Sequence, residues 1–360
     1  MRVYNFSPGP AAMPEEVLRR AAAELVEYGS DGMSVMEMSH RSKMYLAIYD
    51  KVQASIRRVM NIPENYKVLF LQGGASLQFA AVPMNLFTQD CKKADYAISG
   101  NFSKKAMQEC KKYGEAHIAG TTADKGFCAI PQQEELELDP EAAYFHYCMN
   151  NTVYGSLWNY IPETGDVPLV CDMSSCILSE PVDVSKFGVI YAGAQKNMGP
   201  SGLTVVIVRE DLLRGSLPFT PTVMDWKTQA AKDSMYNTPA CYGIYMLGLI
   251  LDWVEELGGL EAMKALNEKK AALLYKTLDE SKLYQTFIEP AYRSKMNVTF
   301  KTGSEELDAK FVKEAAAAGL VNVKGYRDLG GMRASIYNAM PYEGVEALCA
   351  FMKKFEQENA

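Results

Sequence analysis

The sequence VCDMSS at residues 170–175 and the sequence YAGAQKNMGPSG at residues 191–202 decide the fold of this chain. Each begins in a short apolar run that predicts a buried β-strand. The first run ends at Asp172, and Lys196 stands just past the end of the second. Ligands of open α/β sheets bind at the carboxyl ends of the strands, so both side chains can reach one crevice.

Similar runs lie on either side of these two. Short apolar segments alternate with helical or loop stretches at Lys67–Leu71, Ala94–Ser99, Glu115–Ile118, Ala143–Cys148, Leu169–Asp172, Val189–Ala192 and Leu203–Arg209. Strands that are apolar on both faces and alternate with helices favour a mostly parallel sheet covered on both sides. We therefore expect a large α/β domain over residues 15–257 with a mostly parallel seven-stranded sheet.

A different pattern begins after Gly258-Gly259. It predicts helices at Leu260–Asp279, Glu305–Ala318 and Tyr342 to about Glu356, with strands at Met296–Phe300 and Met332–Tyr337. This indicates a smaller α/β domain over residues 258–360, joined by an N-terminal arm over residues 1–14. A chain of 360 residues exceeds what one simple core usually supports, which agrees with two domains.

Composition and charge exclude several classes of protein. Acidic residues number 44 against 37 basic ones, and the net charge of -7 is spread without a basic block, so we expect no nucleic-acid partner. Residues 1–14 lack the basic start and apolar run of a signal peptide, and no stretch reaches the roughly 20 apolar residues of a membrane span. We expect a cytoplasmic protein without a membrane partner. The eight cysteines form no CxxC pair and only three histidines accompany them, so no metal site is expected.

Lys196 and Asp172 together fit pyridoxal phosphate. This cofactor needs a lysine amine for a Schiff base and a carboxylate that keeps its pyridine nitrogen protonated. Either residue alone would more often be a surface lysine or a helix-capping aspartate. The loop around Lys196 is rich in glycine and small residues, which lets the backbone approach a ligand closely.

Residues 69–79, with the sequence LFLQGGASLQF, predict a strand, a glycine turn and the start of a helix. The free N–H groups and the dipole at such a helix start bind anions, so Ala75 and Ser76 are placed to hold a phosphate. The motif is neither G-x-G-x-x-G nor a Walker A sequence. This disfavours a nicotinamide dehydrogenase and a P-loop enzyme.

Seven blocks of sequence resemble successive signatures of the phosphoserine aminotransferase family, in the family's order. They lie at residues 5–10, 38–42, 73–76, 146–148, 191–197, 236–239 and 330–338. The resemblance implies an aspartate-aminotransferase-like architecture of fold type I, pyridoxal phosphate as cofactor, and a homodimer with shared active sites. It implies that Lys196 is the Schiff-base lysine and proton shuttle and that Asp172 pairs with the pyridine nitrogen. The other cofactor residues it implies are Ala75, Ser76, Phe102, Thr152 and Gln195, with Asn237 and Thr238 from a neighbouring subunit.

The same resemblance implies the substrates. The reaction is transamination between glutamate and 3-phosphohydroxypyruvate, which gives O-phosphoserine and 2-oxoglutarate in serine biosynthesis. The implied anion-binding residues are His40, Arg41, Arg327 and Arg333, with Arg333 on the carboxylate. Whether a phosphorylated threonine derivative, 4-phosphohydroxythreonine, is also a substrate stays open. Phe102 replaces the tryptophan that usually stacks on the cofactor, and Tyr326 stands where a histidine is frequent.

Two alternatives stay open, a cysteine desulfurase of the same fold and a non-catalytic protein. A cysteine desulfurase needs a nucleophilic cysteine on a flexible loop, whereas Cys349 lies in an apolar helical pattern typical of a core residue. A non-catalytic pyridoxal-phosphate carrier would keep Lys196 and Asp172 but has no need for Arg41 and Arg333.

Overall fold

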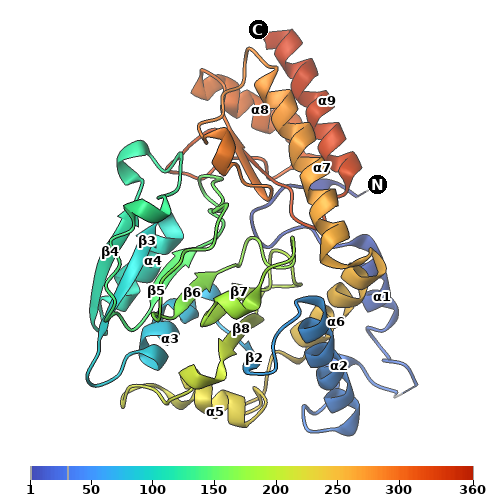
Figure 1. Cartoon of the computed structure of the whole chain (residues 1–360). Helices are drawn as coiled ribbons and strands as arrows, with labels where there is room; N and C mark the ends of the chain where they lie inside the picture. Colours follow the sequence, from blue (N-terminus) through green and yellow to red (C-terminus); the bar gives the residue numbers. More distant parts are fainter. Residues whose placement is uncertain (1, 31, 360) are drawn as a thin grey trace.

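A seven-stranded sheet forms the centre of the structure, a computed structural model that describes residues 2–30 and 32–359 (Figure 1). Its strands, in spatial order, are β2 (Tyr66–Leu71), β8 (Thr204–Arg209), β7 (Val189–Gly193), β6 (Leu169–Asp172), β5 (Phe145–Cys148), β3 (Lys93–Ile98) and β4 (Glu115–Thr121). Strand β8 runs antiparallel to both of its neighbours, and the other pairs are parallel. The predicted mostly parallel seven-stranded sheet is confirmed.

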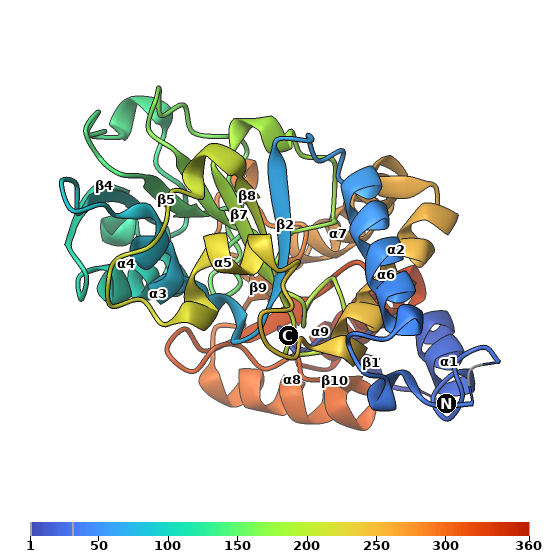
Figure 2. The same cartoon turned by 90° about the horizontal axis from the view of Figure 1, so that it is seen from below.

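Neighbouring residues of each central strand face opposite layers, as the pleat requires. In β6, Cys171 packs into a core with helices α1 (Glu15–Ala23), α2 (Lys43–Val59) and α6 (Cys241–Glu256). Val170 packs into a second core with α3 (Gly74–Leu86), α4 (Asn101–Cys110) and α5 (Trp226–Ala231). Figure 2 shows these two sets of helices on opposite sides of the sheet. Because both faces are covered, the central strands are largely apolar and buried, whereas the edge strand β4 is mostly exposed.

A third core lies under the C-terminal elements. It contains residues from β9 (Asn297–Phe300), β11 (Met332–Ser335), α8 (Glu305–Ala317), α9 (Tyr342–Asn359) and the second half of α7 (Gly259–Asp279). Strands β9 and β11 pair in antiparallel fashion. The N-terminal segment reaches this region too, because β1 (Tyr4–Asn5) pairs in parallel with β10 (Leu320–Val321). The two-residue strands were not predicted from the sequence, and neither were helices α1, α2, α5 and α6.

The edge formed by the carboxyl ends of β5, β6 and β7 is where the structure leaves room for a ligand. Strands β7 and β8 are joined by a loop over residues 194–203, which the bond from Ala194 N to Leu203 O closes at 2.9 Å. This loop contains Lys196, and β6 ends at Asp172. No helix within residues 2–30 and 32–359 is long and apolar enough to cross a membrane.

Candidate active site

A cavity of about 490 Å³ opens at this edge of the sheet. Eight of the predicted site residues line it, and they come from the first turn of α3, α4, the segment after β5, β6, the β7–β8 loop and β11: Ala75, Ser76, Phe102, Thr152, Asp172, Gln195, Lys196 and Arg333. Residues more than 250 positions apart along the chain therefore meet in one place.

Lys196 is held at the wall of this cavity. Its Nζ donates a hydrogen bond to Thr152 Oγ1 at 2.8 Å and lies 5.5 Å from the centre of the Phe102 ring. Burial lowers the pKa of Lys196 to about 8, although the nearby Asp172 carboxylate acts in the opposite direction. A lower pKa means that a larger fraction of the Lys196 amine is unprotonated near neutral pH and can act as a nucleophile.

The backbone of Gly9 lies against Lys196. It has a φ of +142°, and a Cβ placed there would come within 3.3 Å of Lys196 Cγ. A side chain at this position would be strained and would crowd the lysine.

Asp172 is only 7% exposed. Burial raises the pKa of its carboxyl group, and the hydrogen bonds from Ser174 together with the charge of Lys196 oppose that rise. The Ser174 N–H donates to Asp172 Oδ1 at 2.8 Å, which fixes the carboxylate at the end of β6. A buried carboxylate of this kind is stabilised by a cationic or N–H partner in the cavity.

The glycine turn ends strand β2 and begins helix α3. Gly73 caps the helix with a φ of +88°, a left-handed conformation that favours glycine. Ala75 and Ser76 then form the first turn, where main-chain N–H groups have no partner inside the helix. Together with Gln195 at the cavity wall, this is a site with the chemistry for a phosphate.

Arg333 reaches the cavity from β11 and is 5% exposed. Its Nη1 donates to the Thr152 carbonyl at 3.1 Å, whereas its Nε is buried and has no hydrogen-bond partner among residues 2–30 and 32–359. Burial lowers the pKa of Arg333 from its ordinary value, and the guanidinium keeps its charge. A buried cation with an unpaired donor is suited to bind a carboxylate.

Five predicted residues do not line this cavity in the single chain: His40, Arg41, Asn237, Thr238 and Arg327. Arg327 is the clearest case, because its side chain is 96% exposed and lies 3.6 Å from Asp328. Its neighbour Tyr326 lines the cavity instead. Arg41, Asn237 and Thr238 are exposed.

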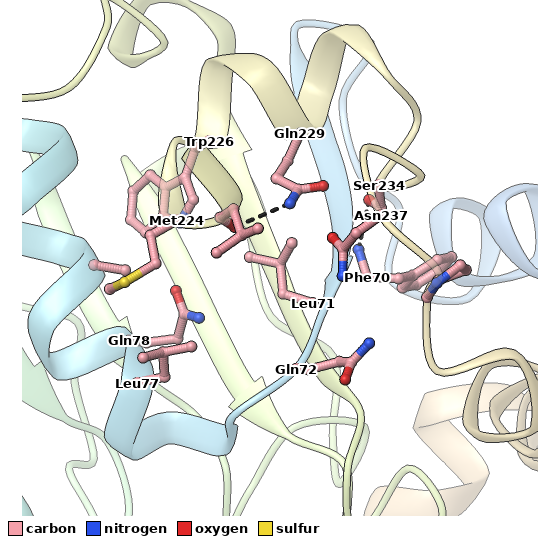
Figure 3. A pocket seen from close by; sticks show the side chains of 13 residues that line it. Phe70, Leu71, Gln72, Leu77, Gln78, Met224, Trp226, Gln229, Ser234 and Asn237 are labelled. Atoms are coloured by element: carbon pink, nitrogen blue, oxygen red, sulfur yellow. Dashed lines mark hydrogen bonds between the residues drawn. The ribbon is translucent and has the colours of Figure 1, made fainter. Parts of the chain in front are cut away.

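Asn237 lies at a separate cavity of about 230 Å³ between β2, α3 and α5 (Figure 3). Its lining includes Gln78, Trp226 and Gln229 but no lysine, arginine or acidic residue. This cavity therefore lacks the lysine amine and the carboxylate that pyridoxal phosphate needs.

The sequence interpretation missed several residues that line the main cavity, among them Pro8, Cys148, Asn150, Ser174 and Ser175. Pro8 and Cys148 lie in two of the seven sequence blocks that resemble the family, at residues 5–10 and 146–148. Their position in these blocks could have identified them as site residues. Asn150 and Ser175 bond to each other across the cavity wall at 2.8 Å, which no local pattern reveals.

The cysteine desulfurase alternative is not favoured. Cys349 is 4% exposed in the third core, and it does not line the cavity. Cys148 does line it, but burial raises its pKa well above the ordinary thiol value, which opposes nucleophilic chemistry.

Comparisons with known proteins agree with this geometry. The profile of the family described as Aminotransferase class-V matches residues 3–348. The chain is 54% identical over 358 residues to a phosphoserine aminotransferase of Pseudomonas aeruginosa, with 99% of each chain covered.

Solved structures give the same result. The phosphoserine aminotransferase of Bacillus circulans subsp. alkalophilus superposes with a TM-score of 0.98 at 48% identity, covering 100% of this chain and 99% of that one. The PLP-bound phosphoserine aminotransferase of Trichomonas vaginalis gives a TM-score of 0.94 at 41% identity, covering 98% of this chain and 100% of that one. The chain belongs to the class-V aminotransferase family and groups within it with the phosphoserine aminotransferases.

Proposed function

We propose that this chain is a pyridoxal-phosphate-dependent aminotransferase of serine biosynthesis, which transfers the amino group of glutamate to 3-phosphohydroxypyruvate. The products are 2-oxoglutarate and O-phosphoserine. The observation that supports this most is the meeting of Lys196, Asp172 and Arg333 in one cavity beside a helix N-terminus. Those are an amine, a carboxylate, a carboxylate-binding cation and a phosphate site, and the reaction needs all four.

The donor set of the cavity fits the cofactor. Pyridoxal phosphate, when bound, supplies an aldehyde that exchanges amines and a ring that accepts electrons. In our proposal Asp172 holds the pyridine nitrogen protonated, and Phe102 stacks on the ring. Thr152 bonds near the phenolic oxygen. Ala75, Ser76 and Gln195 hold the phosphate.

Lys196 has two roles in this proposal. Its amine holds the cofactor covalently between turnovers, and it moves a proton to and from the α-carbon of the substrate. The lowered pKa of Lys196 supports both roles, because a free amine is needed for attack and for proton abstraction. The buried walls exclude water and strengthen the charges that act on the substrate.

Arg333 binds the carboxylate that glutamate and phosphoserine share. Its burial and its unpaired Nε support a charge-assisted bond to that group. His40, Arg41 and Arg327 are proposed to bind the phosphate or the side-chain carboxylate. Arg327 has to turn from its exposed position to do so.

We further propose a homodimer in which a second copy completes each site with Asn237 and Thr238, and also with His40 and Arg41. Exposed apolar side chains accompany these segments, including Met36 at 59%, Val223 at 48% and Tyr236 at 45%. A partner that covers them would remove apolar surface from water. The same contact would bring the four residues to the cavity of the neighbour.

The remaining proposals concern organisation and location. Residues 15–257 are proposed as the large cofactor-binding domain and residues 258–360, with the arm 1–14, as the small domain. The separate third core and the pairing of β1 with β10 support this division. We propose a cytoplasmic location, which suits a biosynthetic enzyme.

The first test is the visible absorption spectrum of the purified protein, before and after separate additions of O-phosphoserine and serine. We expect the absorption of the bound cofactor to change with O-phosphoserine and not with serine. A yellow protein that ignores O-phosphoserine would contradict the substrate, and one that stays colourless with added pyridoxal phosphate would contradict the cofactor. Adding 4-phosphohydroxythreonine tests the second substrate in the same way.

A further inference from the structure

Lys270 of α7 is completely buried, with no exposed surface. Its Nζ is within hydrogen-bond distance of four main-chain carbonyl oxygens of one turn, those of Ile336 at 3.2 Å, Tyr337 at 2.7 Å, Asn338 at 3.4 Å and Met340 at 3.1 Å. Burial lowers the pKa of Lys270 from 10.5 to about 7, and all four partners are neutral carbonyls. Protonated or neutral, the amine keeps N–H donors for this turn, and a side chain that only filled space would not need them.

Helix α7 connects two hydrophobic cores at this point. Leu260 and Met263 of its first half pack in the core beside α2 and α6, whereas Ala271 and Leu274 pack in the third core. Lys270 therefore stands on the border between the cores. Asn267, one turn earlier, bonds to Ser179 O at 3.0 Å and to Asn338 Oδ1 at 2.9 Å, which ties the same turn to the sheet region.

The turn over residues 336–340 is in contact with the wall of the active site. The Asn338 N–H donates to Asn197 Oδ1 at 3.1 Å, and Asn197 is the residue after Lys196. The Tyr337 hydroxyl donates to Pro8 O at 2.8 Å, and Pro8 lines the cavity. On its other side the turn directly follows β11, the strand that contains Arg333.

We propose that Lys270 is a positioning residue for the transamination: it fixes the turn over residues 336–340 and so sets Arg333 relative to Lys196. The inference rests on the proposed function, because only that function gives these two groups a shared substrate. Lys196 acts at the α-carbon and Arg333 binds the α-carboxylate of the same molecule. A small error between them misplaces the reacting bond, and a misplacement of about 1 Å can lower the rate about a hundredfold.

The test compares the holoenzymes of wild type, Lys270→Met and Lys269→Met. Lys269 is the matched control, because it is the adjacent lysine and is exposed, with its Nζ over the Tyr342 ring. For Lys270→Met we expect the KM of both glutamate and 3-phosphohydroxypyruvate to rise and kcat to fall, with a combined loss on the order of ten- to a hundredfold in kcat/KM. Lys269→Met is expected to keep the wild-type constants.

A purely structural role predicts a different result. In that case Lys270→Met lowers the melting temperature, but the folded fraction keeps the wild-type kcat and KM at low temperature, which overturns the proposal. If Lys270→Met does not fold, Asn267→Ala decides, since it removes a second tie to the same turn. It must show the same rise in both KM values, and unchanged values would also overturn the proposal.

Amide hydrogen exchange separates this inference from the proposed function. Exchange at residues 336–340 and 195–197 is expected to accelerate in Lys270→Met and not in Lys269→Met. A wild type without turnover on these substrates would contradict the proposed function, while exchange still reports whether Lys270 fixes the turn. Unchanged exchange in Lys270→Met would contradict the positioning role.

Discussion

Lys196 and Arg333 are linked through a single residue: the lysine bonds to the hydroxyl oxygen of Thr152 at 2.8 Å, and the arginine to its carbonyl oxygen at 3.1 Å. Thr152 lies between the proposed reacting amine and the proposed carboxylate-binding cation. The same residue therefore positions both side chains.

Replacing Lys196 with alanine is expected to lower turnover by at least about 10²- to 10⁴-fold, the range for a positioned acid–base group. Some pyridoxal phosphate should still bind, because the helix N-terminus holds the phosphate through separate contacts. Steady-state kinetics and cofactor content measure the two effects. Lys104→Ala, an exposed lysine on α4, is the control. Wild-type turnover in Lys196→Ala would contradict the mechanism.

Replacing Asp172 with asparagine is expected to reduce kcat by about 10²- to 10³-fold, because the buried charge that stabilises the protonated ring nitrogen is lost. The fold should survive, since asparagine can still accept the Ser174 N–H bond. Circular dichroism checks the fold and kinetics checks the loss. A variant with the wild-type kcat would remove Asp172 from the proposed site.

The pH dependence of cofactor attachment follows from the pKa of Lys196, which burial lowers from 10.5 to about 8. Attachment needs the free amine, so its rate should rise about tenfold per pH unit below pH 8 and level off above it. The native lysine gives up its proton near pH 8 and the unfolded one near pH 10.5, so this group makes the apoprotein more stable as pH rises between these values. Stopped-flow absorbance of apoprotein with pyridoxal phosphate measures the rate. A rate that does not change between pH 6 and 8 would contradict the prediction.

Replacing Arg333 with alanine is expected to raise the KM of both glutamate and 3-phosphohydroxypyruvate, since both carry the carboxylate that Arg333 is proposed to bind. Removing one partner of a buried charge pair weakens binding by about 2–5 kcal/mol of free energy. Arg333→Lys should recover only part of the loss, because lysine lacks the planar fork. Arg214→Ala, an exposed arginine, serves as control. An effect on one substrate alone would mean that Arg333 binds something other than the shared carboxylate.

Mixing two inactive variants tests the shared site. Lys196→Ala and Arg41→Ala should each be inactive or strongly impaired as homodimers. After joint unfolding and refolding, the mixed dimer contains one site with both native residues, so random pairing should restore roughly a quarter of the wild-type activity. If no activity returns while size-exclusion chromatography shows refolded dimers, Lys196 and Arg41 act within the same chain.

The sequence by itself determined the sheet and two chemical groups of the proposed site, the carboxylate of Asp172 and the amine of Lys196. The seven predicted runs became the seven strands. For the central strands the reason is burial on both faces, which needs continuous apolar residues and is visible locally, whereas the edge strand β4 is mostly exposed. Asp172 ends β6 as predicted, and Lys196 follows β7 in a glycine-rich loop. The end of a strand is a local feature of the sequence, so the positions of Asp172 and Lys196 could be predicted.

Only the tertiary structure decided how the C-terminal elements meet the sheet. It brought Arg333 to Thr152, left Arg327 exposed and placed Tyr326 at the cavity, although the sequence pointed to Arg327 as the site residue. It also buried Lys270 under a turn nearly 70 residues away. The physical reason is that these contacts depend on how separate cores pack against one another. Such packing is a property of the whole chain, and no local pattern of residues reports it.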